Sequence, residues 1–90
     1  MTREEAEAMA LQALLWLLSD EERADRLLAL TGLTPDDLRA GLGDPSVLAA
    51  LLGYLTGYEP DLIDFANAQG VPPEHIPAAY HALSGEHWDV

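Results

Sequence analysis

Few side chains of this sequence could do chemistry, and its imidazoles are the most versatile of them. The chain has no cysteine and three histidines, which are His75, His81 and His87. A metal site or an acid–base pair needs its groups on one helix face or converging from several elements. His75 and His81 are six residues apart, which on a helix turns them about 240° from each other. His87 stands in the terminal segment. The pattern therefore predicts surface histidines, no metal site and no catalytic residue.

Carboxylates are abundant, but most lie where helix capping explains them. The runs Asp20-Glu21-Glu22 and Asp36-Asp37 fall in expected first turns, where acids interact favourably with the helix dipole. Asp61 and Asp64 share one helix face and could bind a cation weakly, although a solvated face is the simpler interpretation. The sequence holds no Ser-His-Asp arrangement, phosphate-binding glycine loop or calcium-binding loop. We therefore expect no enzyme and no cofactor.

Aromatic side chains are the remaining candidates for a binding role. Trp88 lies two residues from the last position, so it either packs back on its own domain or offers an anchor to a partner protein. Tyr54, Tyr58 and Tyr80 are the rings expected around that docking surface, with their hydroxyl groups at its rim. These four residues are the predicted partner contacts.

The elements that must position these residues form an internal repeat, which a shift of 38 residues reveals. Eleven positions of the first half then fall on identical or similar residues of the second half. They are Leu14, Trp16, Leu17, Glu21, Leu27, Gly32, Leu33, Pro35, Asp36, Leu38 and Ala40, which align with Leu52, Tyr54, Leu55, Glu59, Phe65, Gly70, Val71, Pro73, Glu74, Ile76 and Ala78. The sequence thus predicts two three-helix units, at about 8–45 and 46–83.

Capping residues mark the helix boundaries. Thr2 with Glu5 and Ser19 with Glu22 have the capping-box spacing, which predicts helix starts at both places. Thr34-Pro35, Asp44-Pro45 and Glu59-Pro60 predict three more starts, because proline suits the first helical position. Gly32, Gly43, Gly57 and Gly70 predict the ends. A sixth helix begins at Pro72-Pro73-Glu74, or at Pro77 if that proline disrupts the first turn.

The apolar patterns divide these helices into two kinds. The second and fifth predicted helices, which begin at Ser19 and at Glu59-Pro60, are amphipathic, with Arg23, Arg26, Asp61 and Asp64 on the polar sides. Segments 3–18 and 45–57 are apolar nearly all round, so they must be covered on every side. We expect these two to pack against each other at the centre, about a pseudo-twofold axis. Apolar surface that the monomer leaves uncovered would be a homodimer interface.

The charge balance limits the partners. Sixteen acids stand against four arginines, for a net charge of −12. Such a surface repels phosphate, which argues against nucleic acid and anionic membranes. Segments 28–38 and 65–76 do have the spacing of a helix-turn-helix, but the second helix of the latter would present no base-reading side chain. We interpret both as structural corners.

The location follows from the same features. The longest apolar run, Ala8–Leu18, is too short to cross a bilayer, and the acidic opening of the chain is unlike a signal peptide. We therefore expect a cytoplasmic protein.

Three stretches resemble a known family. They are Glu4–Leu14, the turn from Thr31 to Arg39, and the ending His87-Trp88-Asp89. Together they resemble small alphaproteobacterial proteins catalogued as a domain of unknown function, number three-five-seven-two in its series. The resemblance implies a small cytoplasmic helical protein and transfers no catalytic or binding residue.

The sequence as a whole predicts an all-α single domain, 1–90, of five or six short helices. Our leading functional hypothesis is a non-enzymatic protein-interaction module that presents an acidic surface to a basic partner, with homodimerisation as a further expectation. One alternative is a small-molecule or enzymatic crevice between the repeats, near Trp16, Tyr54 and Trp88. A second alternative is an acidic mimic of DNA charge.

Overall fold

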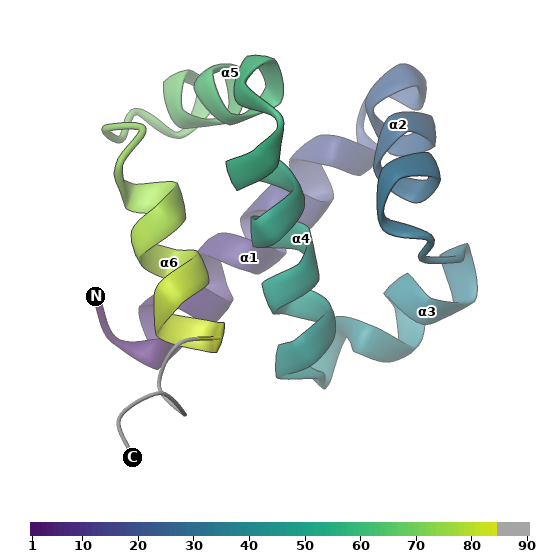
Figure 1. Ribbon diagram of the computed structural model, residues 1–90, viewed down its shortest axis with the longest axis horizontal. Coiled ribbons are helices and arrows are strands. Elements are labelled where there is room, and N and C mark those ends of the chain that lie inside the picture. The colour runs from purple at the N-terminus through teal and green to yellow at the C-terminus, as the bar shows by residue number, and fades with distance from the viewer. Residues whose placement is uncertain (85–90) are drawn as a thin grey trace.

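Six α-helices and one 3₁₀ turn make up the part of the chain that the computed structural model describes, residues 1–84 (Figure 1). The helices are α1 (Arg3–Leu18), α2 (Glu21–Thr31), α3 (Pro35–Ala40), α4 (Pro45–Gly57), α5 (Glu59–Gln69) and α6 (His75–Ser84), and the 3₁₀ turn η1 (Gly41–Gly43) joins α3 to α4. Strands are absent from these residues. The predicted all-α bundle is confirmed. None of the described helices is both long enough and apolar enough to span a membrane.

Three of the six predicted helix starts are confirmed by their capping bonds. The Thr2 hydroxyl accepts from the Glu5 backbone N–H at 3.1 Å, and the Glu5 carboxylate accepts from the Thr2 backbone N–H at 2.8 Å. Thr34 and Asp37 form the same reciprocal pair at the start of α3. Asp44 caps α4 through the backbone of the residue two positions on. Local chemistry alone sets these boundaries.

The start of α2 differs from the prediction by one residue. Asp20, not Ser19, is the cap, because its carboxylate accepts from the backbone N–H of Glu22 at 2.9 Å. Ser19 instead ends α1, where its hydroxyl donates to the Trp16 carbonyl at 2.6 Å. Because Asp20 lies one residue nearer to α2, it takes the cap position. The Ser19 hydroxyl is then available to bond to the end of α1.

Two further boundaries also differ. Gly43 does not close α3, which ends at Ala40 and tightens into η1. The last helix begins at His75, between the two predicted starts. Pro77 then lies in the first turn of α6, where its missing N–H removes no helical hydrogen bond.

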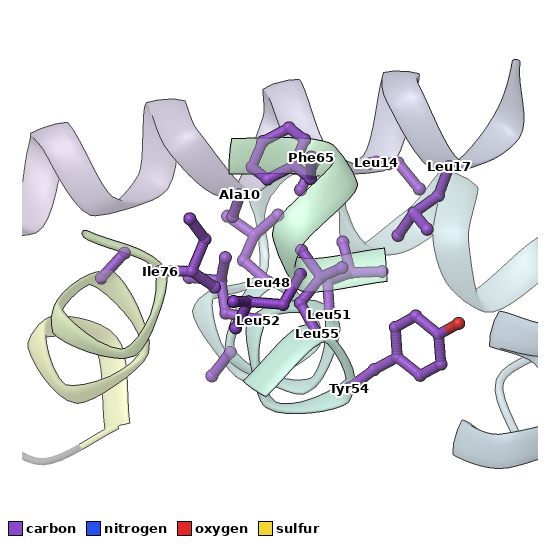
Figure 2. Packing of buried hydrophobic residues seen from close by; sticks show 14 of the residues in the cluster. Ala10, Leu14, Leu17, Leu48, Leu51, Leu52, Tyr54, Leu55, Phe65 and Ile76 are labelled. Carbon is purple, nitrogen blue, oxygen red and sulfur yellow. The ribbon is translucent and has the colours of Figure 1, made fainter. Parts of the chain in front are cut away.

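The core is built around α4, which contacts α1, α2, α5 and α6. Figure 2 shows Leu48, Leu51, Leu52 and Leu55 of α4 between α1 and Ile76 of α6. The α1 side of this contact includes the buried alanines Ala6, Ala10 and Ala13, whose small side chains let neighbouring helices approach closely. The two apolar helices therefore meet at the centre, as expected, but α6 joins them there and contacts both.

The helix bounds agree with the predicted repeat in one pair. Helices α2 and α5 start and end 38 residues apart, and each is followed by a glycine with positive φ, 75° at Gly32 and 69° at Gly70. The third helices differ, since α6 has ten residues where α3 has six. The halves therefore differ in their third helices, and both the pseudo-twofold axis and a common origin of the halves stay predictions.

Candidate functional site

Exposed leucines on α1 form the most unusual surface of the described chain. Leu15 and Leu18 are 66% and 47% exposed, and Leu11 is also exposed. Their spacing of four and three residues places them on one side of α1, away from its buried alanines. Leu42 of η1 is 49% exposed. We call Leu11, Leu15, Leu18 and Leu42 the leucine face. The monomer therefore leaves one side of α1 uncovered, which is the case in which the sequence predicts a homodimer interface.

A groove of about 290 Å³ runs beside these leucines. Its walls are formed by the six leucines Leu14, Leu15, Leu18, Leu28, Leu38 and Leu42, from α1, α2, α3 and η1. Pro35 and Arg39 of α3 complete the lining, so Arg39 contributes the one charged side chain of the groove. The Arg39 guanidinium also lies 3.3 Å from the exposed Asp36 carboxylate, which leaves this rim close to neutral.

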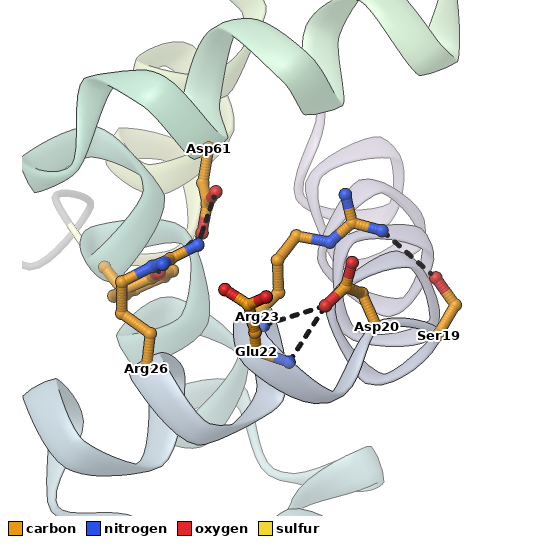
Figure 3. Close-up of polar contacts among 7 residues, drawn as sticks. Ser19, Asp20, Glu22, Arg23, Arg26 and Asp61 are labelled. Carbon is orange, nitrogen blue, oxygen red and sulfur yellow. Dashed lines mark hydrogen bonds and ion pairs between the residues drawn. The ribbon is translucent and has the colours of Figure 1, made fainter.

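A second candidate is polar and lies where α2 meets α4 and α5. Asp61 of α5 is 3% exposed. It accepts from the Arg26 Nη2 at 3.1 and 3.3 Å and from the Tyr54 hydroxyl at 2.6 Å. Arg26 also donates from Nε to the Tyr54 oxygen at 3.3 Å, and its guanidinium stacks on Tyr58, 4.7 Å from the ring centroid. Figure 3 shows Arg26 reaching from α2 to Asp61.

The surroundings in this cluster keep Arg26 charged and Tyr54 neutral. The Tyr54 hydroxyl and the Asp61 carboxylate raise the pKa of Arg26 above its ordinary value. Burial, followed by the hydrogen bond to Asp61, raises the pKa of Tyr54 to about 12. Tyr54 is therefore a neutral hydrogen-bond donor at any ordinary pH. The hydrogen bonds among Arg26, Tyr54 and Asp61 connect α2, α4 and α5.

Arg23 makes a parallel contact one turn earlier on α2. Its guanidinium lies 3.8 Å from the centroid of Trp16, which in turn packs on Phe65 with ring centroids 5.5 Å apart. Its Nη2 donates weakly to Ser19 at 3.4 Å (Figure 3), while its Nε is buried with no hydrogen-bond partner among residues 1–84. Both arginines of α2 thus turn towards the protein, and the prediction that they lie on its solvent side is wrong.

The predicted partner contacts are not gathered on one surface. Tyr54 is buried inside the polar cluster, and Tyr58 stacks on it with ring centroids 5.9 Å apart. Tyr80 is half-buried, and its Cε1 would lie 3.1 Å from a Cβ placed on Gly53, so it packs against the α4 backbone. Trp88 lies outside the described residues. Contact of these rings with a partner stays a prediction.

His75, His81 and Asp64 lie where the sequence placed them, whereas the solvated face predicted for Asp61 is wrong, because Asp61 is buried. His75, His81 and Asp64 are exposed on their helices, while His87 lies outside the described residues. Within residues 1–84, no three His, Asp or Glu side chains gather where a metal ion could be held.

The crevice predicted between the two halves has a counterpart beside Tyr54. A hollow of about 380 Å³ lies between α2 and α4, lined by Leu30 and Thr31 of α2, by Tyr54 and small residues of α4, and by Tyr58. The Thr31 hydroxyl donates to the carbonyl of Leu27, and the Tyr54 hydroxyl is taken by Asp61. These two hydroxyls are therefore already committed, and a small-molecule role for this hollow stays a prediction.

The sequence did not reveal Asp61 and Arg26 as a pair. Asp61 stands in the first turn of α5, where an acid is ordinary, and Arg26 is 35 residues away. Tyr54, seven residues before Asp61, also belongs to the cluster. No rule about neighbouring residues, however, connects Tyr54, Asp61 and Arg26.

Comparison with known proteins gives a family and no function. Residues 3–86 match the family model described as "Protein of unknown function (DUF3572)". No curated protein and no solved structure match the chain.

Proposed function

The chain belongs to this family of unknown function, and we propose that it acts as a non-enzymatic protein-interaction module. The observation that carries the proposal is the leucine face, with Leu15 66% exposed beside an apolar groove. Exposed apolar patches of this kind mark contact surfaces on small proteins. We place this interaction in the cytoplasm.

A basic partner protein fits the rest of the exterior. The net charge is −12, and the arginines make contacts within the chain. On α2 the division is sharp, because Arg23 and Arg26 turn inwards while Glu21, Glu22 and Asp25 are exposed. An uncompensated acidic surface accelerates the approach of a cationic partner and selects against acidic ones. We propose the outer side of α2 as the surface that such a partner meets.

Charge variants test this proposal. The α2 variant carries Glu21→Gln, Glu22→Gln and Asp25→Asn, and a matched control carries Glu59→Gln, Asp64→Asn and Glu74→Gln. Both remove three exposed carboxylates, so they have the same net charge. Each tagged protein is used to capture partners from an extract of the source organism. Captured proteins are identified by mass spectrometry, and their affinity is measured by titration calorimetry at two salt concentrations.

We expect a basic protein that binds the wild type and the control but is retained much less by the α2 variant. Its affinity should fall as salt rises, because exposed charges are screened. If both variants lost the partner equally, binding would depend on the net charge and not on the outer side of α2. Binding that neither variant nor salt changes would refute the basic partner.

A further inference from the structure

We propose that the leucine face pairs with the leucine face of a second copy of this chain. This inference rests on the proposed interaction function and names one of its partners. A symmetric dimer needs exposed side chains and a groove that can receive them on the same surface. The exposed leucines of the leucine face and the apolar groove meet this requirement. Leu15 and Leu18 stand exposed on α1 and at the same time line the groove. In a twofold dimer each copy offers both parts to the other.

The charges favour a second copy over a basic occupant. The α1 segment Ala8–Leu18 holds no charged residue. The groove lining adds one, Arg39, which is paired with Asp36. A cationic helix would find no unpaired carboxylate in this lining, whereas it would find several on the outer side of α2. An uncharged, apolar surface fits the groove best, and the leucine face of another copy is such a surface.

The pairing also brings two strongly acidic molecules together where repulsion is smallest. Each copy has a net charge of −12, so most encounters are unfavourable at low salt. Contact through the segment Ala8–Leu18, which carries no charge, places no carboxylate of α1 at the interface centre. It also leaves the outer side of α2 free for the basic partner.

The test compares two leucines of nearly equal exposure. Leu15→Gln changes the leucine face, while Leu30→Gln changes an equally accessible leucine of α2, 63% exposed and outside the groove lining. Sedimentation of the full chain over roughly 1–200 µM gives the dimer dissociation constant, since dimer content depends on protomer concentration. Circular dichroism confirms that both variants remain folded.

We expect the wild type to dimerise and Leu15→Gln to weaken the dimer by at least about tenfold, because the substitution acts on both copies. Leu30→Gln should change the constant by less than about twofold. Raising salt from about 0.1 to about 1 M should strengthen the dimer, since it screens the repulsion and not the apolar contact. A wild type that stays monomeric throughout, or equal effects of the two variants, would overturn the proposal.

Cross-linking supplies a second readout. The chain has no cysteine, so Leu15→Cys places a single thiol on the face, with Leu30→Cys as control. Oxidation should join two Leu15→Cys chains efficiently and two Leu30→Cys chains poorly. A monomeric full chain that dimerises once residues 85–90 are removed would instead assign the face to its own last segment, which also overturns the proposal.

The two proposals can fail separately. The α2 charge variant should remain a dimer while losing the basic partner. Leu15→Gln should keep the basic partner while becoming a monomer. If Leu15→Gln loses the basic partner as well, the groove belongs to that partner and the second copy is refuted.

Discussion

The contrast between Asp61 and Asp64 provides the sharpest test of the structure. Both lie on α5, three residues apart, but Asp61 is 3% exposed and bound by Arg26 and Tyr54, while Asp64 is exposed. Asp61→Asn and Asp64→Asn are the same chemical change. Only the first disturbs an interaction between distant helices.

The magnitude follows from what Asp61→Asn leaves behind. Breaking a fully buried ion pair costs about 3–5 kcal/mol, mostly because one charge stays buried and unpaired. The Arg26 side chain is 31% exposed, so water can partly replace the lost carboxylate. An asparagine oxygen can also still accept from Tyr54. We therefore expect a loss of about 2 kcal/mol in the free energy of unfolding and, for Asp64→Asn, a change within about 0.5 kcal/mol.

Urea unfolding followed by circular dichroism measures both values, at one protein concentration because dimerisation would shift the midpoint. For a domain of this size the Asp61→Asn loss corresponds to a melting temperature lower by roughly 8–16 °C. Equal stability of the two variants would refute the buried cluster and with it the placement of α2 against α5.

The cluster also predicts a response to alkali. The pKa of Tyr54 is raised to about 12 in the folded chain, against about 10 for a free tyrosine. Below pH 10 both states are protonated and the contribution of Tyr54 to stability is fully present. Between about pH 10 and 12 the unfolded state releases its proton first, so stability falls as pH rises. Tyr54→Phe should remove this part of the slope; an unchanged slope would contradict the raised pKa.

Two local predictions concern the corner between α3 and α4. Gly41→Ala should destabilise the chain by about 1–3 kcal/mol, because a Cβ there would lie 2.5 Å from the side chain of Val47, whereas Gly43→Ala meets no atom within 4 Å and should leave urea unfolding nearly unchanged. Asp44 should titrate below its ordinary pKa in carboxyl NMR spectra, because the side chain and backbone of Ser46 donate to it. Its stabilisation of α4 is then present above about pH 4 and lost as pH falls through the lowered pKa. An Asp44 titration at the ordinary value would contradict the cap.

The sequence predicted well what neighbouring residues decide. The capping pairs of Thr2 with Glu5 and of Thr34 with Asp37 span three residues each, so their chemistry is visible in the sequence. The glycines that end α2 and α5 were also predictable, because each lies directly after its helix in the sequence. The cap at Ser19 was wrong only because the adjacent Asp20 competes for the same position.

Contacts between distant helices were beyond the reach of such rules. Asp61 has the type and position of an ordinary first-turn acid, but Tyr54 of α4 and Arg26 of α2 bind its carboxylate in a buried position. Arg26 likewise follows the polar pattern of an amphipathic helix, yet its guanidinium is drawn in by Asp61 and by the ring of Tyr58. Burial of a charge depends on its partner, and the partner is set by the tertiary arrangement.

The leucine face follows from an inequality between the two halves. The second half ends in α6, whose ten residues contact both α1 and α4. At the corresponding place in the first half, α3 has only six residues and gives way to η1. Six residues form less than two turns, too short to cover the C-terminal part of α1, so Leu15 and Leu18 remain exposed. The shorter α3 is thus the structural reason that this acidic chain keeps an uncharged surface open for contact.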